Sequence, residues 1–209
     1  MKLLTLDINF VGTRKKIKRK IQITDDYNLN CLHIAIQELF YFNYDLEHEF
    51  EFNNVVYLPE AEHDFANLVE MQKVLQEEMD KLISKEVDID QLFNTDKTYQ
   101  DDCTTKLHQL KLSVGDSIEY TYDKDNNYEF TIELVQTNPA SKSKIAIVDL
   151  KGKFIPQGLD VETYNNLKEL KSGEAYEQLV ELEKSFDKKL LKQNVESLIP
   201  TTTLYDEAN

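Results

Sequence analysis

The sequence predicts an α+β protein in which a mixed, largely antiparallel sheet is packed by one amphipathic helix, with additional flanking helices. Apolar residues alternate with polar ones in several short segments, and one segment between them repeats at helical spacing. Hydrophobic residues make up 41% of the 209, whereas there are only five glycines and four prolines. This composition indicates a folded globular chain without long flexible linkers.

Residues 115–135 contain the clearest pair of strands. Ile118, Tyr120 and Tyr122 alternate with polar residues, and after a polar break the alternation resumes with Phe130, Ile132 and Leu134. Two alternating runs on either side of a short polar segment are typical of a β-hairpin. We expect the remaining chain to cover the apolar face of this hairpin.

Further strands are predicted over residues 3–11, 17–23, 46–52 and 144–150, and a short one over 55–58 after an Asn53–Asn54 turn. After the polar segment 25–30, a helix is predicted through residue 42. Its apolar stripe includes Leu29, Leu32, Ile36 and Phe40, and His33 lies on the same face. His33 is therefore either a hydrogen-bonded core residue, which we favour, or a ligand-binding or acid–base group.

The spacing of apolar residues predicts a long helix over residues 60–85. Its narrow, mostly apolar stripe is made by Phe65, Leu68, Gln72, Leu75, Met79 and Leu82. We expect this stripe to pack on the sheet or on a second copy of the chain. Residues 87–102 are predicted to form a surface excursion, and residues from 160 onward are helical with a break at 172–174. This suggests a sheet domain over 1–158 with a helical insertion at 60–85, and a helical C-terminal extension over 159–209.

Charge is unevenly distributed along the chain, whose formal net charge is −15. Residues 1–20 hold seven basic side chains and Asp7, a sum of +6, so the other 189 residues carry 17 basic and 38 acidic side chains, a sum of −21. Most of the surface therefore repels nucleic acid and anionic membranes. The candidate nucleic-acid-binding residues are Arg14, Lys15, Lys16, Lys18 and Lys20.

A solvated strand face is the alternative interpretation of this basic run, because lysines on strands discourage edge-to-edge aggregation. Alternation places Lys16, Lys18 and Lys20 on the solvent side, and Ile17, Arg19 and Ile21 on the inner side. A buried Arg19 needs a carboxylate or carbonyl partner. Asp123 in the hairpin is our first candidate for that partner, whereas an anionic ligand is favoured if Arg19 faces an open cleft.

The sequence contains no Gly-rich phosphate loop, HExxH motif, nucleophile elbow or paired CxxC. Asp123, Asp125 and Asn127 match the first ligands of a calcium loop, but Tyr128 and Leu134 replace the required glycine and glutamate. The spacing of His48, Glu60 and His63 is not diagnostic of zinc. We therefore predict no cofactor and no metal, and regard an enzyme built around His33 and Asp123 as the least favoured hypothesis.

Cys31 and Cys103 lie far apart, so we expect free thiols in a reducing cytoplasm. No apolar run approaches the roughly 20 residues of a membrane span. The N-terminus alternates and carries Asp7, which favours a strand over a signal peptide.

Three segments together resemble the plasmid pRiA4b ORF-3-like family. They are the strand IKRKIQI at 17–23, the helix LNCLHIAIQELF at 29–40 and the hairpin at 118–132. Residues matching the family pattern are Arg19, Leu32, His33, Ile36, Gln37, Phe40, His48, Phe50, Tyr120, Tyr122 and Asp123. Lys18 and Tyr128 replace tryptophans of the pattern, and 124–126 replace Phe-Gly-Asp.

The resemblance implies an α+β fold and a link to plasmids and mobile elements, whereas the biochemical activity of the family is not established. His33, Arg19, Tyr122 and Asp123 are the candidate ligand-binding residues. We expect a cytoplasmic binding or accessory module that takes a protein partner or an anionic ligand and no membrane. The alternative is a mobile-element-associated nucleic-acid-binding protein that uses the Arg14–Lys20 run.

Overall fold

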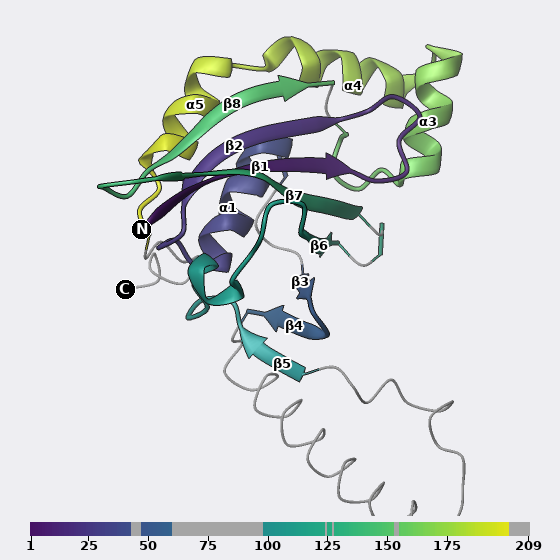
Figure 1. The fold of residues 1–209 in the computed structure, drawn as a ribbon. Coiled ribbons are helices and arrows are strands. Elements are labelled where there is room, and N and C mark those ends of the chain that lie inside the picture. Colours follow the sequence, from purple (N-terminus) through teal and green to yellow (C-terminus); the bar gives the residue numbers. More distant parts are fainter. Residues whose placement is uncertain (43–46, 60–97, 124, 127, 153–154, 201–209) are drawn as a thin grey trace, which may run out of the picture.

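The computed structural model describes residues 1–42, 47–59, 98–123, 125–126, 128–152 and 155–200 (Figure 1). In this part of the chain, one sheet has the strand order β5-β4-β3-β6-β7-β1-β2-β8. The strands are β1 Lys2–Phe10, β2 Lys18–Thr24, β3 His48–Phe52, β4 Val55–Leu58, β5 Thr98–Asp101, β6 Ser117–Tyr122, β7 Tyr128–Pro139 and β8 Ile145–Lys151. Neighbours are antiparallel except for the parallel pair β4 and β5.

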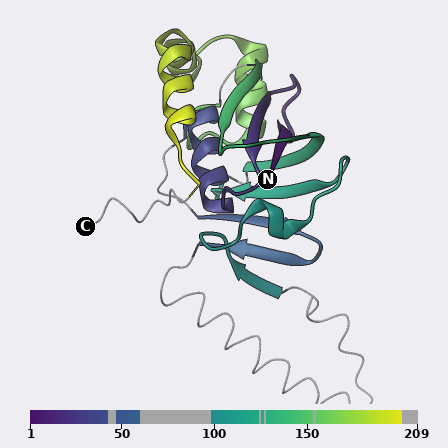
Figure 2. The same cartoon turned by 60° about the vertical axis from the view of Figure 1, so that its left-hand side comes forward.

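Helix α1, Leu29–Phe40, packs on one face of this sheet (Figures 1 and 2). Its first turn is capped by the side chain of Asn28, which accepts a hydrogen bond from the Cys31 amide at 2.7 Å. The 3-10 helix η1, Leu107–Leu110, precedes the hairpin, and α3 Val161–Leu170, α4 Glu174–Ser185 and α5 Lys188–Ser197 follow β8. Helix α5 runs along β8 (Figure 1). The predicted α+β architecture is confirmed.

The core lies between α1 and the sheet. Strand register aligns the inward-facing side chains: Ile8 of β1 lies opposite Ile132 of β7, which lies opposite Ile118 of β6. Tyr164, Leu179, Leu191 and Val195 of the C-terminal helices belong to the same apolar cluster. The division of the chain at residue 158 stays a prediction.

Strand β5 lies within the segment that the sequence predicts as a surface excursion. Thr98–Asp101 has no apolar alternation, and its exposure alternates between exposed and half-buried. It becomes a strand because β4 supplies a parallel partner, with Val55 opposite Thr98.

The predicted helix 60–85 and its apolar stripe lie outside the described residues. No helix in the described part of the chain is long and apolar enough to cross a membrane.

The basic run is arranged as the alternation predicts. Ile17, Arg19 and Ile21 are buried, whereas Lys16 is exposed and Lys18 and Lys20 are half-buried. Lys18 forms an ion pair with Asp7, and the Lys20 Nζ lies 3.4 Å from the other carboxylate oxygen of Asp7. Two of the five candidate nucleic-acid-binding cations are thus already paired within the sheet.

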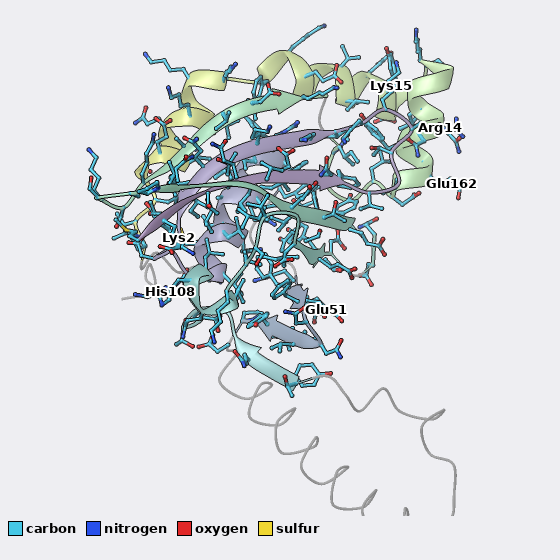
Figure 3. All side chains as sticks on the ribbon, in the orientation of Figure 1. Lys2, Arg14, Lys15, Glu51, His108 and Glu162 are labelled. Atoms are coloured by element: carbon cyan, nitrogen blue, oxygen red, sulfur yellow. The ribbon has the colours of Figure 1, made fainter. Side chains whose placement is uncertain are left out.

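Arg14 lies where the turn after β1 meets α3. Its backbone amide donates to Asn165 Oδ1 at 2.9 Å, and Asn165 Nδ2 donates to the Gly12 carbonyl at 3.0 Å. Lys15 follows at the exposed tip of this turn (Figure 3). The start of the basic run therefore fastens α3 to the sheet.

Arg19 is buried and binds carbonyl oxygens. Its Nε donates to the Leu39 carbonyl at 2.9 Å, and one terminal nitrogen donates to the carbonyls of Lys18 at 3.1 Å and Lys151 at 2.8 Å. The guanidinium lies 4.8 Å from the centroid of the Phe40 ring. Burial lowers the pKa of Arg19 to about 10.

The predicted pairing of Arg19 with Asp123 is wrong. Strands β1 and β7 separate β2 from β6, after which Asp123 follows. Asp123 instead accepts from Asn126 Nδ2 at 2.8 Å within the hairpin turn. The last turn of α1 lies closer to Arg19 than Asp123 does. The Leu39 carbonyl in this turn accepts from Arg19, because the last carbonyls of a helix have no partner within the helix.

Replacing Arg19 with Met is expected to destabilise the protein by about 2–4 kcal/mol, because hydrogen bonds to a buried charged group are lost and carbonyls are left unpaired. The free energy of unfolding in urea measures this loss. Lys15→Met removes the same charge from an exposed site and is expected to change stability by less than about 0.5 kcal/mol. Equal effects of the two substitutions would contradict a structural role for Arg19.

Candidate functional site

Five polar side chains lie together between α1 and the sheet, and we call them the polar cluster. They are His33 and Gln37 of α1, His48 of β3, Tyr120 of β6 and Asp102, which directly follows β5. None is more than 4% exposed. Polar groups buried to this degree must be hydrogen-bonded or they cost stability.

Hydrogen bonds and ring stacking connect the polar cluster. Tyr120 Oη lies 2.8 Å from His33 Nδ1 and accepts from Gln37 Nε2 at 2.8 Å. His48 Nε2 lies 2.7 Å from Asp102 Oδ2. The His33 and His48 rings stack with centroids 3.5 Å apart and planes 12° apart. The cluster thus joins α1 to two strands and to the segment after β5.

The hydroxyl of Tyr120 bonds to both polar side chains that α1 contributes. It accepts from Gln37 Nε2, and it shares a second hydrogen bond with His33 Nδ1. His33 Nε2, Gln37 Oε1 and Asp102 Oδ1 are buried without a hydrogen-bond partner among the described residues.

Local structure explains how these residues meet. His33 and Gln37 are four residues apart and therefore lie on the same face of α1. His48 opens β3 directly opposite Tyr122 of β6. Asp102 is held by the first turn of α1, because its carbonyl accepts from the Asn30 amide at 3.2 Å. The Thr105 carbonyl accepts from the Leu29 amide at 2.9 Å in the same way.

Burial determines the ionisation of the polar cluster. It lowers the pKa of His33 well below its usual 6.5, and the charge of nearby His48 lowers it further. Burial also raises the pKa of Tyr120 well above 10. His33 and Tyr120 are therefore neutral at physiological pH, and both are closed to solvent. This arrangement supports hydrogen bonding within the core rather than contact with a substrate.

A family model for plasmid pRiA4b ORF-3-like proteins matches residues 2–194. The chain belongs to this family. Among solved structures, it is similar to the crystal structure of a protein of unknown function, MM3350, from Methanosarcina mazei Go1. The two are 21% identical, the match covers 95% of this chain and 94% of that one, and the TM-score is 0.61. The likeness shows a shared fold, and no curated protein matches the chain.

Four residues that carry the plasmid pRiA4b ORF-3-like resemblance meet in the polar cluster: His33, Gln37, His48 and Tyr120. The prediction that His33 is buried and bonded internally is confirmed. Sequence reasoning missed Asp102, because it belongs to no motif and reaches His48 only through the parallel pairing of β5.

The other predicted ligand-binding residues do not form one site. The Tyr122 ring centroid lies 6.1 Å from that of His33, and its hydroxyl accepts from Gln157 at 3.3 Å. Asp123 lies in the hairpin turn and Arg19 is bound to backbone carbonyls near the end of α1. Their roles as ligand-binding residues stay predictions.

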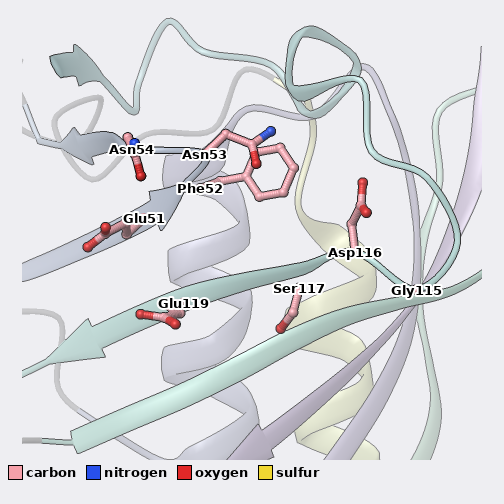
Figure 4. Close-up of a pocket in the computed structure, with 8 residues that line it drawn as sticks. All are labelled: Glu51, Phe52, Asn53, Asn54, Gly115, Asp116, Ser117 and Glu119. Atoms are coloured by element: carbon pink, nitrogen blue, oxygen red, sulfur yellow. The ribbon is translucent and has the colours of Figure 1, made fainter. Parts of the chain in front are cut away.

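The opposite face of the sheet is acidic over β3, β6 and β7. Glutamates alternate with the inward-facing residues of three adjacent strands, and we call them the acidic face: Glu49, Glu51, Glu119, Glu129 and Glu133. Glu51 lies directly opposite Glu119. Beside this pair, a hollow of about 390 Å³ is lined by Glu51, Phe52, Asn53, Asn54, Gly115, Asp116, Ser117 and Glu119 (Figure 4).

The pKa of His33 predicts a loss of stability in acid. Because the folded-state pKa lies below the unfolded value of 6.5, the unfolded chain binds more protons below pH 6.5. The stabilising contribution of neutral His33 is present above pH 6.5 and is lost as the pH falls toward the folded-state pKa. The slope of the free energy of unfolding against pH that this residue causes approaches about 1.4 kcal/mol per pH unit.

Urea denaturation of His33→Gln between pH 7 and pH 5 tests this. The variant is expected to be less stable at pH 7 and to lose less stability on acidification than the wild type. His108→Gln, at an exposed histidine, is expected to keep the wild-type slope. If the free energy of unfolding of His33→Gln fell with pH as steeply as that of the wild type, His33 would not be the cause of the loss of stability in acid.

Proposed function

We propose that this protein is a cytoplasmic binding module without catalytic activity, and that its acidic face binds a basic segment of a protein partner. The observation that carries the proposal is the group of carboxylates on the outward face of β3, β6 and β7. Glu119, Glu129 and Glu133 are exposed, and Glu51 lies directly opposite Glu119. The partner supplies lysine or arginine side chains to these carboxylates.

Electrostatics supports a cationic partner. Like charges directly opposite one another destabilise a sheet, and Glu51 lies opposite Glu119, so this part of the sheet favours a cation beside Glu119. The sum of −21 over residues 21–209 steers basic molecules toward the protein and repels acidic ones.

The polar cluster supports the non-catalytic part of the proposal. Its histidines and carboxylate are closed to solvent and bonded to one another, so they hold α1 on the sheet. The plasmid origin in the family's description supports an accessory role on a mobile element. The ion pairs of Lys18 and Lys20 with Asp7 weaken the alternative in which the basic run binds nucleic acid.

Fluorescence anisotropy with a labelled lysine-rich peptide tests the acidic face. Glu119→Gln/Glu133→Gln is expected to weaken binding about 2- to 30-fold, because each exposed ion pair contributes roughly 0.2–1 kcal/mol. The matched control Glu177→Gln/Glu181→Gln removes two exposed carboxylates from α4. This control is expected to retain most of the affinity, and salt is expected to weaken all binding.

Equal losses in the two double variants would overturn the proposal, because they would reflect net charge alone. Binding of duplex DNA with a steep salt dependence, abolished by Lys15→Gln/Lys16→Gln, would instead establish the nucleic-acid alternative.

A further inference from the structure

Three side chains of types that can bind metal ions meet where β5 ends. One carboxylate oxygen from each of Asp101 and Asp102 and the Sγ of Cys103 lie within 4.8 Å of one another. Ligand atoms around a tetrahedral Zn²⁺ lie roughly 3.5 Å apart, given bond lengths of about 2.0–2.3 Å. Binding of Zn²⁺ would therefore require the more distant of these atoms to move about 1 Å closer together.

One oxygen of the buried Asp102 carboxylate has no hydrogen-bond partner among the described residues. Asp102 is 0% exposed, its Oδ2 binds His48, and its Oδ1 is the oxygen that lacks a partner in the described part of the chain. A buried carboxylate oxygen without a partner is costly, and the neighbouring carboxylate of Asp101 adds a second negative charge. A cation bound by both residues removes this cost.

We propose that Asp101, Asp102 and Cys103 bind a Zn²⁺ ion. A thiolate combined with carboxylates favours Zn²⁺ over Ca²⁺ and Mg²⁺, which prefer oxygen ligands alone. Three protein ligands leave the fourth position to water or to an external ligand. His48 orients the Asp102 carboxylate from behind, as hydrogen-bonded partners of metal ligands commonly do.

The second cysteine provides a matched control. Cys31 is buried in α1, where its Sγ donates to the Ile199 carbonyl at 3.6 Å. Burial raises the pKa of its thiol to about 12, which disfavours the thiolate that binds metal. Cys103 is half-buried at the surface. The two thiols therefore differ in access as well as in position.

The test is titration of the full-length, chelator-treated protein with Co²⁺, followed by competition with Zn²⁺. We expect one Co²⁺ per chain with a thiolate-to-cobalt charge-transfer band that Zn²⁺ abolishes. Cys31→Ala is expected to keep the band and Cys103→Ser to lose it. Asp101→Asn, at a half-buried side chain, is expected to weaken binding, and His48→Gln to weaken it about 10- to 100-fold.

Absence of the band in the wild type, its persistence in Cys103→Ser, or its loss in Cys31→Ala would overturn the proposal. Tighter binding of Ca²⁺ than of Zn²⁺ would also overturn it. Circular dichroism establishes that each variant is folded. If Cys103→Ser does not fold, unchanged Co²⁺ affinity in Asp101→Asn would serve as the contradicting result.

Discussion

The hydroxyl of Tyr120 is the interaction on which the arrangement of α1 and the sheet depends. It accepts from Gln37 and binds His33, so one oxygen on β6 bonds to two side chains one turn apart on α1. His33 stacks on His48, which binds Asp102. Because these groups are closed to water, any shift of α1 along the sheet would leave several buried polar groups unpaired.

This constraint on one face of the sheet determines what the other face presents. In β3, His48 and Phe50 point toward α1, so Glu49 and Glu51 point away; in β6, Tyr120 points inward and Glu119 outward. A shift of one residue in strand register would bury the glutamates and expose the aromatic residues. The polar cluster and the acidic face are therefore two consequences of one register. The segment that carries Asp102 and Cys103 is fixed at the same time, because its carbonyls accept from the first amides of α1.

The spacing of apolar residues predicted most helices and strands, but it could not predict contacts between segments that are far apart in the sequence. Alternation located β1, β2, β3, β6 and β7, and helical spacing located α1 with His33 on its inner face. Strand β5 was missed because Thr98–Asp101 has no apolar period and depends on pairing with β4. Asp102 was missed for the same reason, since no spacing in the sequence relates it to His48. Arg19 was assigned to Asp123 because both match one family pattern, but strand order separates them and the end of α1 supplies the partner instead.

The free energy of unfolding of Tyr120→Phe, compared with that of Tyr27→Phe, tests the central role of the polar cluster most directly. Both substitutions remove one buried hydroxyl. Within the described part of the chain, that of Tyr27 makes one hydrogen bond, to the Leu198 carbonyl at 2.9 Å. Tyr120→Phe leaves both His33 and Gln37 without their partner and is expected to cost about 2–4 kcal/mol, whereas Tyr27→Phe is expected to cost about 1 kcal/mol. A loss in Tyr120→Phe no larger than that in Tyr27→Phe would contradict the account.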